Sequence, residues 1–225
     1  MKCVLCGSGR FGAAVLKMVL ASGWQVGAIF CPFDGRGDSL FGQADLSGLP
    51  LFKAGSLRAD TLGDGVDLII AAHSHDFIGR KSRMRARLGA IGYHPSLLPL
   101  HRGRDAVRWT VRDRDKVAGG SVYWLTDTVD GGPIAAQDWC FVRPDDTASE
   151  LWRRELFPMG VRLLAETLKN ISAGTLVQVP QDRSLATWEP AMVGGPRLFR
   201  PELELLGQAP SGVKVVRERL ALRGS

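Results

Sequence analysis

The sequence has no long apolar run, and this absence excludes the usual ways of crossing a membrane with a helix. No apolar stretch reaches the roughly 18 residues that a membrane-spanning helix needs. The first residues, MKCVLCGSGRFG, reach glycine too early to hold the apolar centre of a signal peptide. The sequence therefore predicts a soluble protein of the cytoplasm.

Cysteine is scarce, with four in 225 residues, and its placement argues against a cysteine-based framework. Cys3 and Cys6 have no second CxxC to complete a zinc site, and Cys31 and Cys140 lie in or beside apolar segments. Neither a disulfide framework nor a structural zinc site is predicted, and the compartment expected is a reducing one.

The basic residues lack the interleaved aromatic residues that are typical of nucleic-acid-binding surfaces. The net charge is +6, but the arginines are scattered over segments such as 80–87 and 108–114. Nucleic acid and membrane partners are therefore not expected, and attraction of an anionic small molecule is the better interpretation. The sequence carries no signal for an oligomeric state.

Short apolar runs alternate with segments of helical period, which is typical of an α/β fold with a mixed, mostly parallel sheet flanked by helices. With 45% hydrophobic residues, a chain of 225 residues can bury a full core. Strands are predicted at Lys2–Cys6, Trp24–Phe30, Leu49–Phe52, Val66–Ala72 and Ala90–His94, and helices at Phe11–Ser22, Ile78–Leu88 and Asp105–Arg114.

The pattern changes in the second half of the chain. Gly120–Asp127 and Ile134–Val142 are predicted strands joined by a glycine-proline turn, which favours an antiparallel edge. Thr147 and Glu150 predict a capping box that opens a long helix to about Asn170, which Pro158 should kink or break. Residues 1–190 are expected to form one domain, and residues 191–225 an irregular tail on its surface.

A glycine-rich loop, Gly7-Ser8-Gly9-Arg10-Phe11-Gly12, follows the first predicted strand and has the spacing of a phosphate-binding turn. A dinucleotide site also needs an acidic residue after the second strand, but Cys31 and Pro32 stand there and Asp34 comes later. Three interpretations follow, namely an NAD(P) site, a structural tight turn, or an anion site for another ligand.

A histidine and an aspartate stand where an α/β sheet usually binds its ligands. His94 ends a predicted buried strand, because Pro95 disfavours the helical conformation for the residue before it. Asp130 precedes Gly131 and Gly132, in a loop that can bring its backbone close to a ligand. Both residues are therefore candidates for a functional site.

Four segments carry a resemblance to a known family: YHPSLLPLHRG, the VDGGPI turn, RPDDTASELWRRELFPMG and ATWEP. Together they resemble the formyltransferase family, whose members use 10-formyltetrahydrofolate to formylate glycinamide ribonucleotide, methionyl-tRNA or sugar amines. The likeness extends over about residues 1–190 and is greatest to the hydrolase domain of 10-formyltetrahydrofolate dehydrogenase. It implies a Rossmann-like formyltransferase fold, 10-formyltetrahydrofolate as formyl donor, and His94 and Asp130 as the catalytic pair.

The family's third catalytic residue is an asparagine two positions before the histidine, and this sequence has Gly92 there. In the hydrolase domain that it resembles, this position is also not asparagine. The family chemistry implies that His94 stabilises negative charge on the formyl oxygen, while Asp130 orders a water and helps to move a proton. Either a water, His73 or His75 fills the gap left by Gly92, or the reaction is slow, or the protein only binds its ligand.

The resemblance also implies a set of ligand-binding residues. For the folate these are Ala71, Ala72, His73, Ser74, His75, Phe77, Pro95, Leu97, Thr126, Asp127, Val129 and Gly131. For the acceptor they are Gly7, Ser8, Gly9, Arg10 and Arg102. The basic run around Arg102 is expected to face an anionic acceptor or the glutamate tail of the folate, unless it is plain surface. No metal site is predicted, because an H-x-H pair such as His73 and His75 is more often part of a loop than a set of metal ligands.

The predicted function is transfer of a formyl group to an amine of a small anionic metabolite. The alternative is a hydrolase that releases formate and tetrahydrofolate, favoured by the dehydrogenase likeness and by Gly92. A non-catalytic folate-binding paralogue and a dinucleotide-dependent oxidoreductase are further alternatives. A tRNA acceptor is not expected, because the residues after Pro190 are too few for the C-terminal domain of methionyl-tRNA enzymes.

Overall fold

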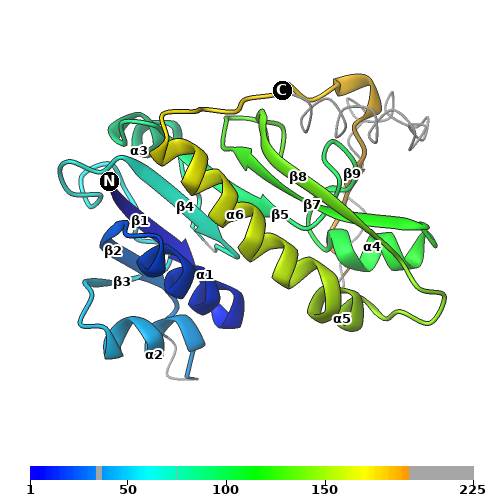
Figure 1. The fold of residues 1–225 in the computed structure, drawn as a ribbon, viewed down its shortest axis with the longest axis horizontal. Coiled ribbons are helices and arrows are strands. Elements are labelled where there is room, and N and C mark those ends of the chain that lie inside the picture. The colour runs from blue at the N-terminus through cyan, green and yellow to red at the C-terminus, as the bar shows by residue number, and fades with distance from the viewer. Residues whose placement is uncertain (34–36, 75, 193–225) are drawn as a thin grey trace. The chain divides into compact units, whose positions relative to one another are not determined.

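The structure is a computed structural model, and it describes residues 1–33, 37–74 and 76–192 (Figure 1). The chain divides into two compact units. The first comprises Met1–Tyr93, Trp124–Asp127 and Leu164–Leu176, and the second His94–Tyr123, Thr128–Leu163 and Val177–Ser225. The predicted tail lies outside the described residues from residue 193 on, and a single domain over residues 1–190 stays a prediction.

The first unit is built on parallel strands in the order β3-β2-β1-β4-β5. Their bounds are β1 Lys2–Gly7, β2 Gln25–Cys31, β3 Leu51–Lys53, β4 Leu68–Ala72 and β5 Ala90–His94. Leu5, Ile29 and Ile70 are completely buried. Because strands of a parallel sheet are covered on both faces, they form the continuous apolar runs that the sequence shows.

Helices connect these strands. They are α1 Gly9–Ala21, α2 Ser39–Leu46 and α3 Arg80–Arg85, and α1 packs against α2 and against β1 and β2 (Figure 1). The sequence prediction missed α2, which is short, contains Gly42 and has little apolar periodicity. Asp38 starts this helix, because its side chain accepts hydrogen bonds from the backbone N–H groups of Leu40 and Phe41.

The second unit contains an antiparallel pair, β7 Val117–Trp124 and β8 Ile134–Phe141, which confirms the predicted reversal of direction. A second, two-stranded sheet pairs β6 Arg102–Gly103 with β9 Trp188–Glu189 in parallel. The helix α4 Ala106–Arg112 and the 3₁₀ turn η2 Arg183–Leu185 complete this unit. The mixed, mostly parallel strands with flanking helices confirm the predicted fold class.

The long helical segment begins with the predicted capping box of Thr147 and Glu150. It runs through α5 Ala148–Leu151, a π-helical turn η1 Trp152–Leu156, and α6 Phe157–Ser172. Pro158 has no N–H and would crowd the carbonyl four residues earlier in a regular α-helix. The helix nevertheless does not break there, and the irregularity appears as the wider π turn just before the proline. Among the described helices, none is long and apolar enough to cross a membrane.

Candidate active site

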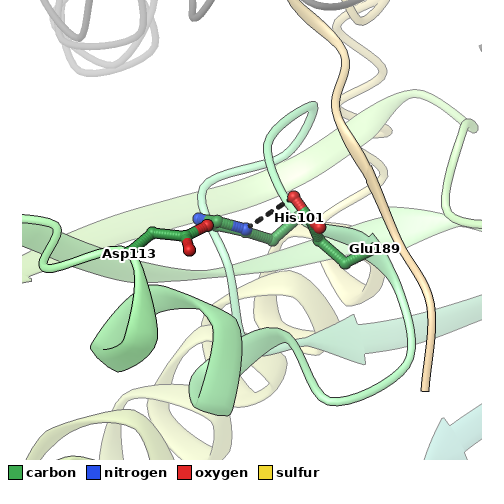
Figure 2. Close-up of side chains that lie close together, drawn as sticks. All are labelled: His101, Asp113 and Glu189. Carbon is green, nitrogen blue, oxygen red and sulfur yellow. Dashed lines mark ion pairs between the residues drawn. The ribbon is translucent and has the colours of Figure 1, made fainter. Parts of the chain in front are cut away.

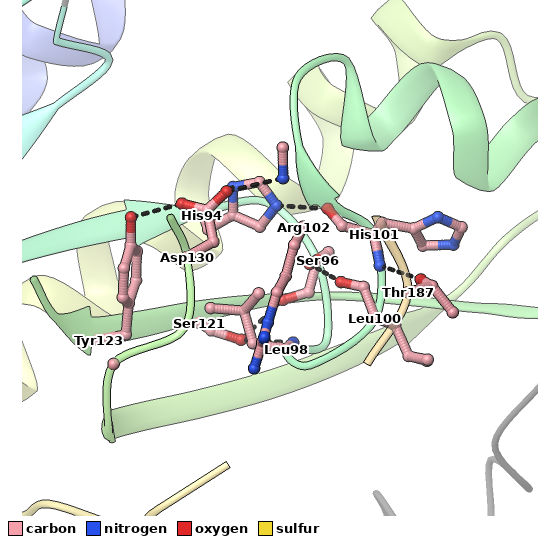
Figure 3. Close-up of polar contacts among 12 residues, drawn as sticks. His94, Ser96, Leu98, Leu100, His101, Arg102, Ser121, Tyr123, Asp130 and Thr187 are labelled. Carbon is pink, nitrogen blue, oxygen red and sulfur yellow. Dashed lines mark hydrogen bonds and ion pairs between the residues drawn. The ribbon is translucent and has the colours of Figure 1, made fainter. Parts of the chain in front are cut away.

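His94 ends β5 and is buried, with its ring held by the backbone of the following loop (Figure 3). Its Nε2 lies 2.7 Å from the carbonyl oxygen of His101. A carbonyl oxygen only accepts hydrogen bonds, so Nε2 must carry a proton. The other nitrogen, Nδ1, is therefore the ring atom that remains for a second polar partner.

Asp130 faces this nitrogen, with its Oδ2 3.7 Å from Nδ1 of His94. Its backbone has a φ of +49°, in the left-handed region that aspartate tolerates better than most residues. Oδ1 accepts a hydrogen bond of 2.6 Å from the Tyr123 hydroxyl, and Oδ2 accepts one of 2.7 Å from the Gly103 N–H. Burial, together with the charge of Asp130, raises the pKa of Tyr123 well above its ordinary value, so the phenol stays a donor.

The separation of 3.7 Å between Nδ1 of His94 and Oδ2 of Asp130 is too long for a direct hydrogen bond. It is short enough for one small polar atom to bond both groups at about 2.8 Å from each. An amine nitrogen or a water oxygen placed there would contact both groups. The pair can therefore hold a nucleophile and exchange a proton with it.

Gln181 supports the loop that carries Asp130. Its Nε2 donates to the carbonyl oxygens of Asp130, at 2.8 Å, and Gly132, at 2.6 Å. Its Oε1 accepts from Nη2 of Arg102, at 2.6 Å. Arg102 is buried, which lowers the pKa of its guanidinium against the opposing effect of Asp130. The structure thus places this predicted acceptor-binding arginine against Gln181, where it stiffens the support of the loop.

The loop that holds His94 is fixed by the ATWEP segment. Thr187 accepts a hydrogen bond from the His101 N–H on its Oγ1, at 2.7 Å, and its own N–H donates to the Pro99 carbonyl. Gly103, with a φ of +99°, lies so close to β9 that an added Cβ would be 2.6 Å from the Glu189 carbonyl oxygen. These contacts explain why a segment so far along the chain carries a motif of the same site.

Hydrogen bonds also join the HPSLLP segment, residues 94–99, to strand β7 of the antiparallel pair. The Ser121 hydroxyl donates to the Ser96 carbonyl at 2.7 Å and accepts from the Leu98 N–H at 3.1 Å. Leu97, predicted to bind folate, is buried, and its side chain fills the space beside Gly119. Pro95 is half-buried. The segment therefore forms a rigid base for His94.

Comparisons with known proteins identify the family of this chain. Residues 57–167 match the family model described as formyl transferase. The mitochondrial 10-formyltetrahydrofolate dehydrogenase of Mus musculus is 36% identical over 201 residues, which cover 84% of this chain and 22% of that protein. A methionyl-tRNA formyltransferase of Lactobacillus delbrueckii subsp. bulgaricus is 31% identical over 202 residues, covering 84% of this chain and 64% of that protein. The chain belongs to the formyltransferase family.

Solved formyltransferase structures share the fold. Glycinamide ribonucleotide transformylase 1 from Symbiobacterium toebii superposes with a TM-score of 0.68 at 22% identity, covering 80% of this chain and 94% of that one. The sugar 3N-formyl transferase WlaRD superposes with a TM-score of 0.72 at 14% identity, covering 92% and 77% of the two chains. The chain spans about a fifth of the length of the dehydrogenases that it matches.

Several of the predicted folate-binding positions lie on exposed loops or at the end of the strand before them. In the first unit, β4 ends with Ala71 and Ala72, His73 follows with a φ of +60°, and Phe77 is 85% exposed. In the second unit, Val129 is 54% exposed beside Asp130. Single exposed apolar side chains are common on protein surfaces, so a contact of either residue with the folate stays a prediction.

The other predicted folate positions differ in their surroundings. Ser74 is half-buried, and its hydroxyl accepts a hydrogen bond of 3.0 Å from the Asp76 N–H. Thr126 and Asp127 are exposed, and Asp127 forms an ion pair with Arg83. An added Cβ on Gly131 would lie 2.5 Å from Cγ2 of Thr128, so the turn there is tight. His75 lies outside the described residues.

The hydrogen-bonding groups of the glycine loop, residues 7–12, are used in contacts within the protein. The Gly9 N–H, at the start of α1, donates to Oδ2 of Asp38 at 2.7 Å, and the Ser8 hydroxyl donates to the His73 carbonyl at 2.8 Å. An added Cβ on Gly7 would lie 2.4 Å from the Ala72 carbonyl oxygen, so the glycine serves close packing. Of the predicted acceptor residues here, only Arg10 has an exposed side chain. These contacts are those expected if the glycine loop is a structural tight turn, which was one of its three interpretations.

Sequence reasoning missed three parts of the candidate site, namely Tyr123, Gln181 and the His101 carbonyl. Tyr123 lies inside a predicted strand, where an aromatic residue indicates a core position as readily as a partner for an aspartate. Gln181 lies in a segment without periodicity, 51 residues after Asp130. The nearby ATWEP motif was the one available signal that this part of the chain belongs to the site.

Proposed function

We propose that this chain binds 10-formyltetrahydrofolate and transfers its formyl group to an amine of a small anionic metabolite, with His94 and Asp130 as the catalytic pair. The observation that carries the proposal is the placement of His94 Nδ1 3.7 Å from Asp130 Oδ2, with the proton of Nε2 held by the His101 carbonyl. The names of the related dehydrogenases support the formyl donor, as does the sugar formyltransferase crystallised with 5-N-formyl-THF.

The donor supplies an electrophilic formyl carbon on a nitrogen that must leave with a proton. Asp130 accepts a hydrogen bond from the attacking amine and orients it. Nδ1 of His94 takes up a proton from the amine as it attacks, and the N–H formed there donates to the oxygen on which negative charge develops; such a donor typically lowers the barrier by about 2.7–4 kcal/mol. The proton lost by the amine passes through this pair to the departing nitrogen, so the enzyme ends as it began.

Tyr123 and Gln181 position Asp130 for this step. The Tyr123 hydroxyl and the Gly103 N–H fix both carboxylate oxygens, and Gln181 holds the backbone carbonyls on either side of the turn. Catalysis by a positioned group depends on keeping it within about 0.5 Å of the productive geometry. The support of the loop is therefore part of the proposed activity.

The folate-binding positions on the two loops and the acceptor site at residues 7–10 remain part of the proposal. An anionic acceptor at the start of α1 would compete with Asp38 for the Gly9 N–H. The exposed Arg10 would add positive charge beside it.

Water is the second candidate acceptor, and Gly92 favours it. This residue stands in β5 where the family keeps an asparagine, so one side chain that could select and orient an amine is missing. The likeness to 10-formyltetrahydrofolate dehydrogenase, at 36% identity, points the same way. In that case the atom held between His94 and Asp130 is a water oxygen, and the products are formate and tetrahydrofolate.

One assay separates the two acceptors. Purified protein is incubated with 10-formyltetrahydrofolate alone, and then with amino sugar nucleotides, amino-acid derivatives, or glycinamide and aminoimidazole ribonucleotides, while tetrahydrofolate, formate and formylated amine are measured. Transfer predicts tetrahydrofolate only with an amine, and hydrolysis predicts formate without one. Turnover that is equal in the parent and in His94→Ala, or absent under every condition at high enzyme concentration, contradicts both.

A further inference from the structure

Three metal-ligating side chains converge in the second unit, apart from the catalytic pair (Figure 2). They are His101, Asp113 at the end of α4, and Glu189 of β9, and one ligand atom of each lies within 4.8 Å of the others. Figure 2 shows the imidazole of His101 lying between the two carboxylates. Spacing along the chain could not reveal this group, because its members come from three distant segments.

The imidazole of His101 has the environment of a metal ligand. Its Nε2 makes a 2.8 Å hydrogen bond with Oδ2 of Asp115, which fixes the ring and leaves Nδ1 as the free ligand position. A metal-binding histidine almost always has such a carboxylate or carbonyl on its other nitrogen. The Nδ1 atom is buried and has no hydrogen-bond partner.

The contact between His101 and Glu189 also fits two ligands of one ion. Oε1 of Glu189 lies 3.3 Å from Nδ1 of His101, yet the two atoms are not aligned as a hydrogen bond. Neighbouring ligands around a tetrahedral zinc ion, with bonds of about 2.0–2.1 Å, are separated by about 3.3 Å and point at the ion. A zinc ion bound by both residues would therefore explain the 3.3 Å spacing and the misalignment together.

The negative charge of the cluster also favours binding of a cation. Three carboxylates, those of Asp113, Asp115 and Glu189, surround one imidazole. A divalent ion bound among them would offset two of these three negative charges.

We propose that His101, Asp113 and Glu189 bind one divalent transition-metal ion of the zinc class, with Asp115 orienting the histidine. One imidazole and two carboxylates suit zinc, whereas calcium takes six to eight oxygen ligands. The ion would join α4 and β9 to the loop whose His101 carbonyl holds His94. This site is independent of the proposed formyl transfer, and its primary effect is on stability.

The test uses tag-free full-length protein stripped of metal with a chelator. Zinc is titrated by calorimetry, and cobalt is followed by visible absorption, which reports ligation without any enzyme assay. We expect one equivalent of zinc to bind and to raise the thermal midpoint. We expect Asp113→Asn and Glu189→Gln each to weaken zinc binding at least tenfold, and Asp115→Asn to weaken it by about 10–100-fold.

Asp145→Asn is the matched control, because this exposed aspartate lies in the same unit and outside the cluster. Its zinc binding should equal that of the parent. Circular dichroism identifies any variant that fails to fold. If both ligand variants fail to fold, the cobalt spectrum of the parent alone tests whether the metal site exists. The proposal is overturned if the parent binds no zinc and gives no cobalt spectrum, or if folded Asp113→Asn and Glu189→Gln bind zinc like the parent. The cluster is then a protonated histidine between carboxylates.

Discussion

Two aspartates, each beside a glycine motif, differ in what their carboxylates contact. Asp38 in the first unit uses both carboxylate oxygens on backbone N–H groups, those of Gly9, Leu40 and Phe41. Asp130 in the second unit also accepts two hydrogen bonds, yet one of its oxygens still faces the His94 imidazole at 3.7 Å. The spacing of glycines predicts a loop that can take an anion, but whether the protein fills that loop itself depends on a distant residue.

The largest effect is expected from Asp130→Asn. Asparagine also tolerates a positive φ, so the turn should survive while the negative charge facing His94 is lost. General acid-base catalysis contributes about 10²–10⁴-fold, and we expect a fall in kcat of that size. Single-turnover assays with 10-formyltetrahydrofolate measure it, with circular dichroism as the folding control. A variant within threefold of the parent would remove Asp130 from the catalytic pair.

Tyr123→Phe should have the next largest effect. The change deletes one hydroxyl and leaves an oxygen of Asp130 without its donor. A hydrogen bond to a charged group is worth about 1.5–3 kcal/mol, so we expect kcat to fall by at least about tenfold. The KM for the folate should change little, because Tyr123 acts through Asp130. An unchanged kcat with a raised KM would instead mean that Tyr123 contacts the ligand.

Gln181→Ala tests the support of the loop. It leaves Arg102 and the carbonyls of Asp130 and Gly132 without their partner, and such unsatisfied groups cost about 1–3 kcal/mol. We expect the free energy of unfolding in urea to fall by about that amount. Gln137→Ala is a useful comparison, since Gln137 bonds the Leu98 carbonyl of the other supporting loop. If only the Gln137 variant is destabilised, the role given to Gln181 is wrong.

The smallest effect is expected from Asp38→Asn. The amide oxygen can still cap α2, but the amide NH2 group cannot accept from the Gly9 N–H, so the free energy of unfolding should fall by about 1 kcal/mol. Loss of the charge beside the Gly9 N–H should lower the KM of an anionic acceptor if residues 7–10 bind it. An unchanged KM would leave the glycine loop as a structural turn, and the contrast with Asp130 would then be complete.

The sequence was informative where local pattern determines structure. The buried parallel strands, the capping box at Thr147 and the antiparallel pair follow from apolar runs and turn residues within a few positions. Helix α2 was missed because its start depends on Asp38 and its periodicity is weak. The two-residue strands β6 and β9 form only because distant segments meet, which no local pattern indicates.

The residues of the candidate site also differ in whether the sequence could predict them. His94 and Asp130 could be predicted because both stand in short motifs with a resemblance to a known family. Tyr123, Gln181 and the group of His101, Asp113 and Glu189 could not, because contacts across the fold define their roles. The proposed catalytic pair was thus easier to find in the sequence than the residues that hold it in place.

The bond from Gln181 to the turn at Asp130 has a consequence for synthesis of the chain on the ribosome. Gln181 is made 51 residues after Asp130, which takes about 3–10 s at ordinary rates of translation. During that interval the carbonyls of Asp130 and Gly132 have no Gln181 to bond. The nascent protein therefore contains His94 and Asp130 for seconds before Gln181 can fix the turn that carries Asp130.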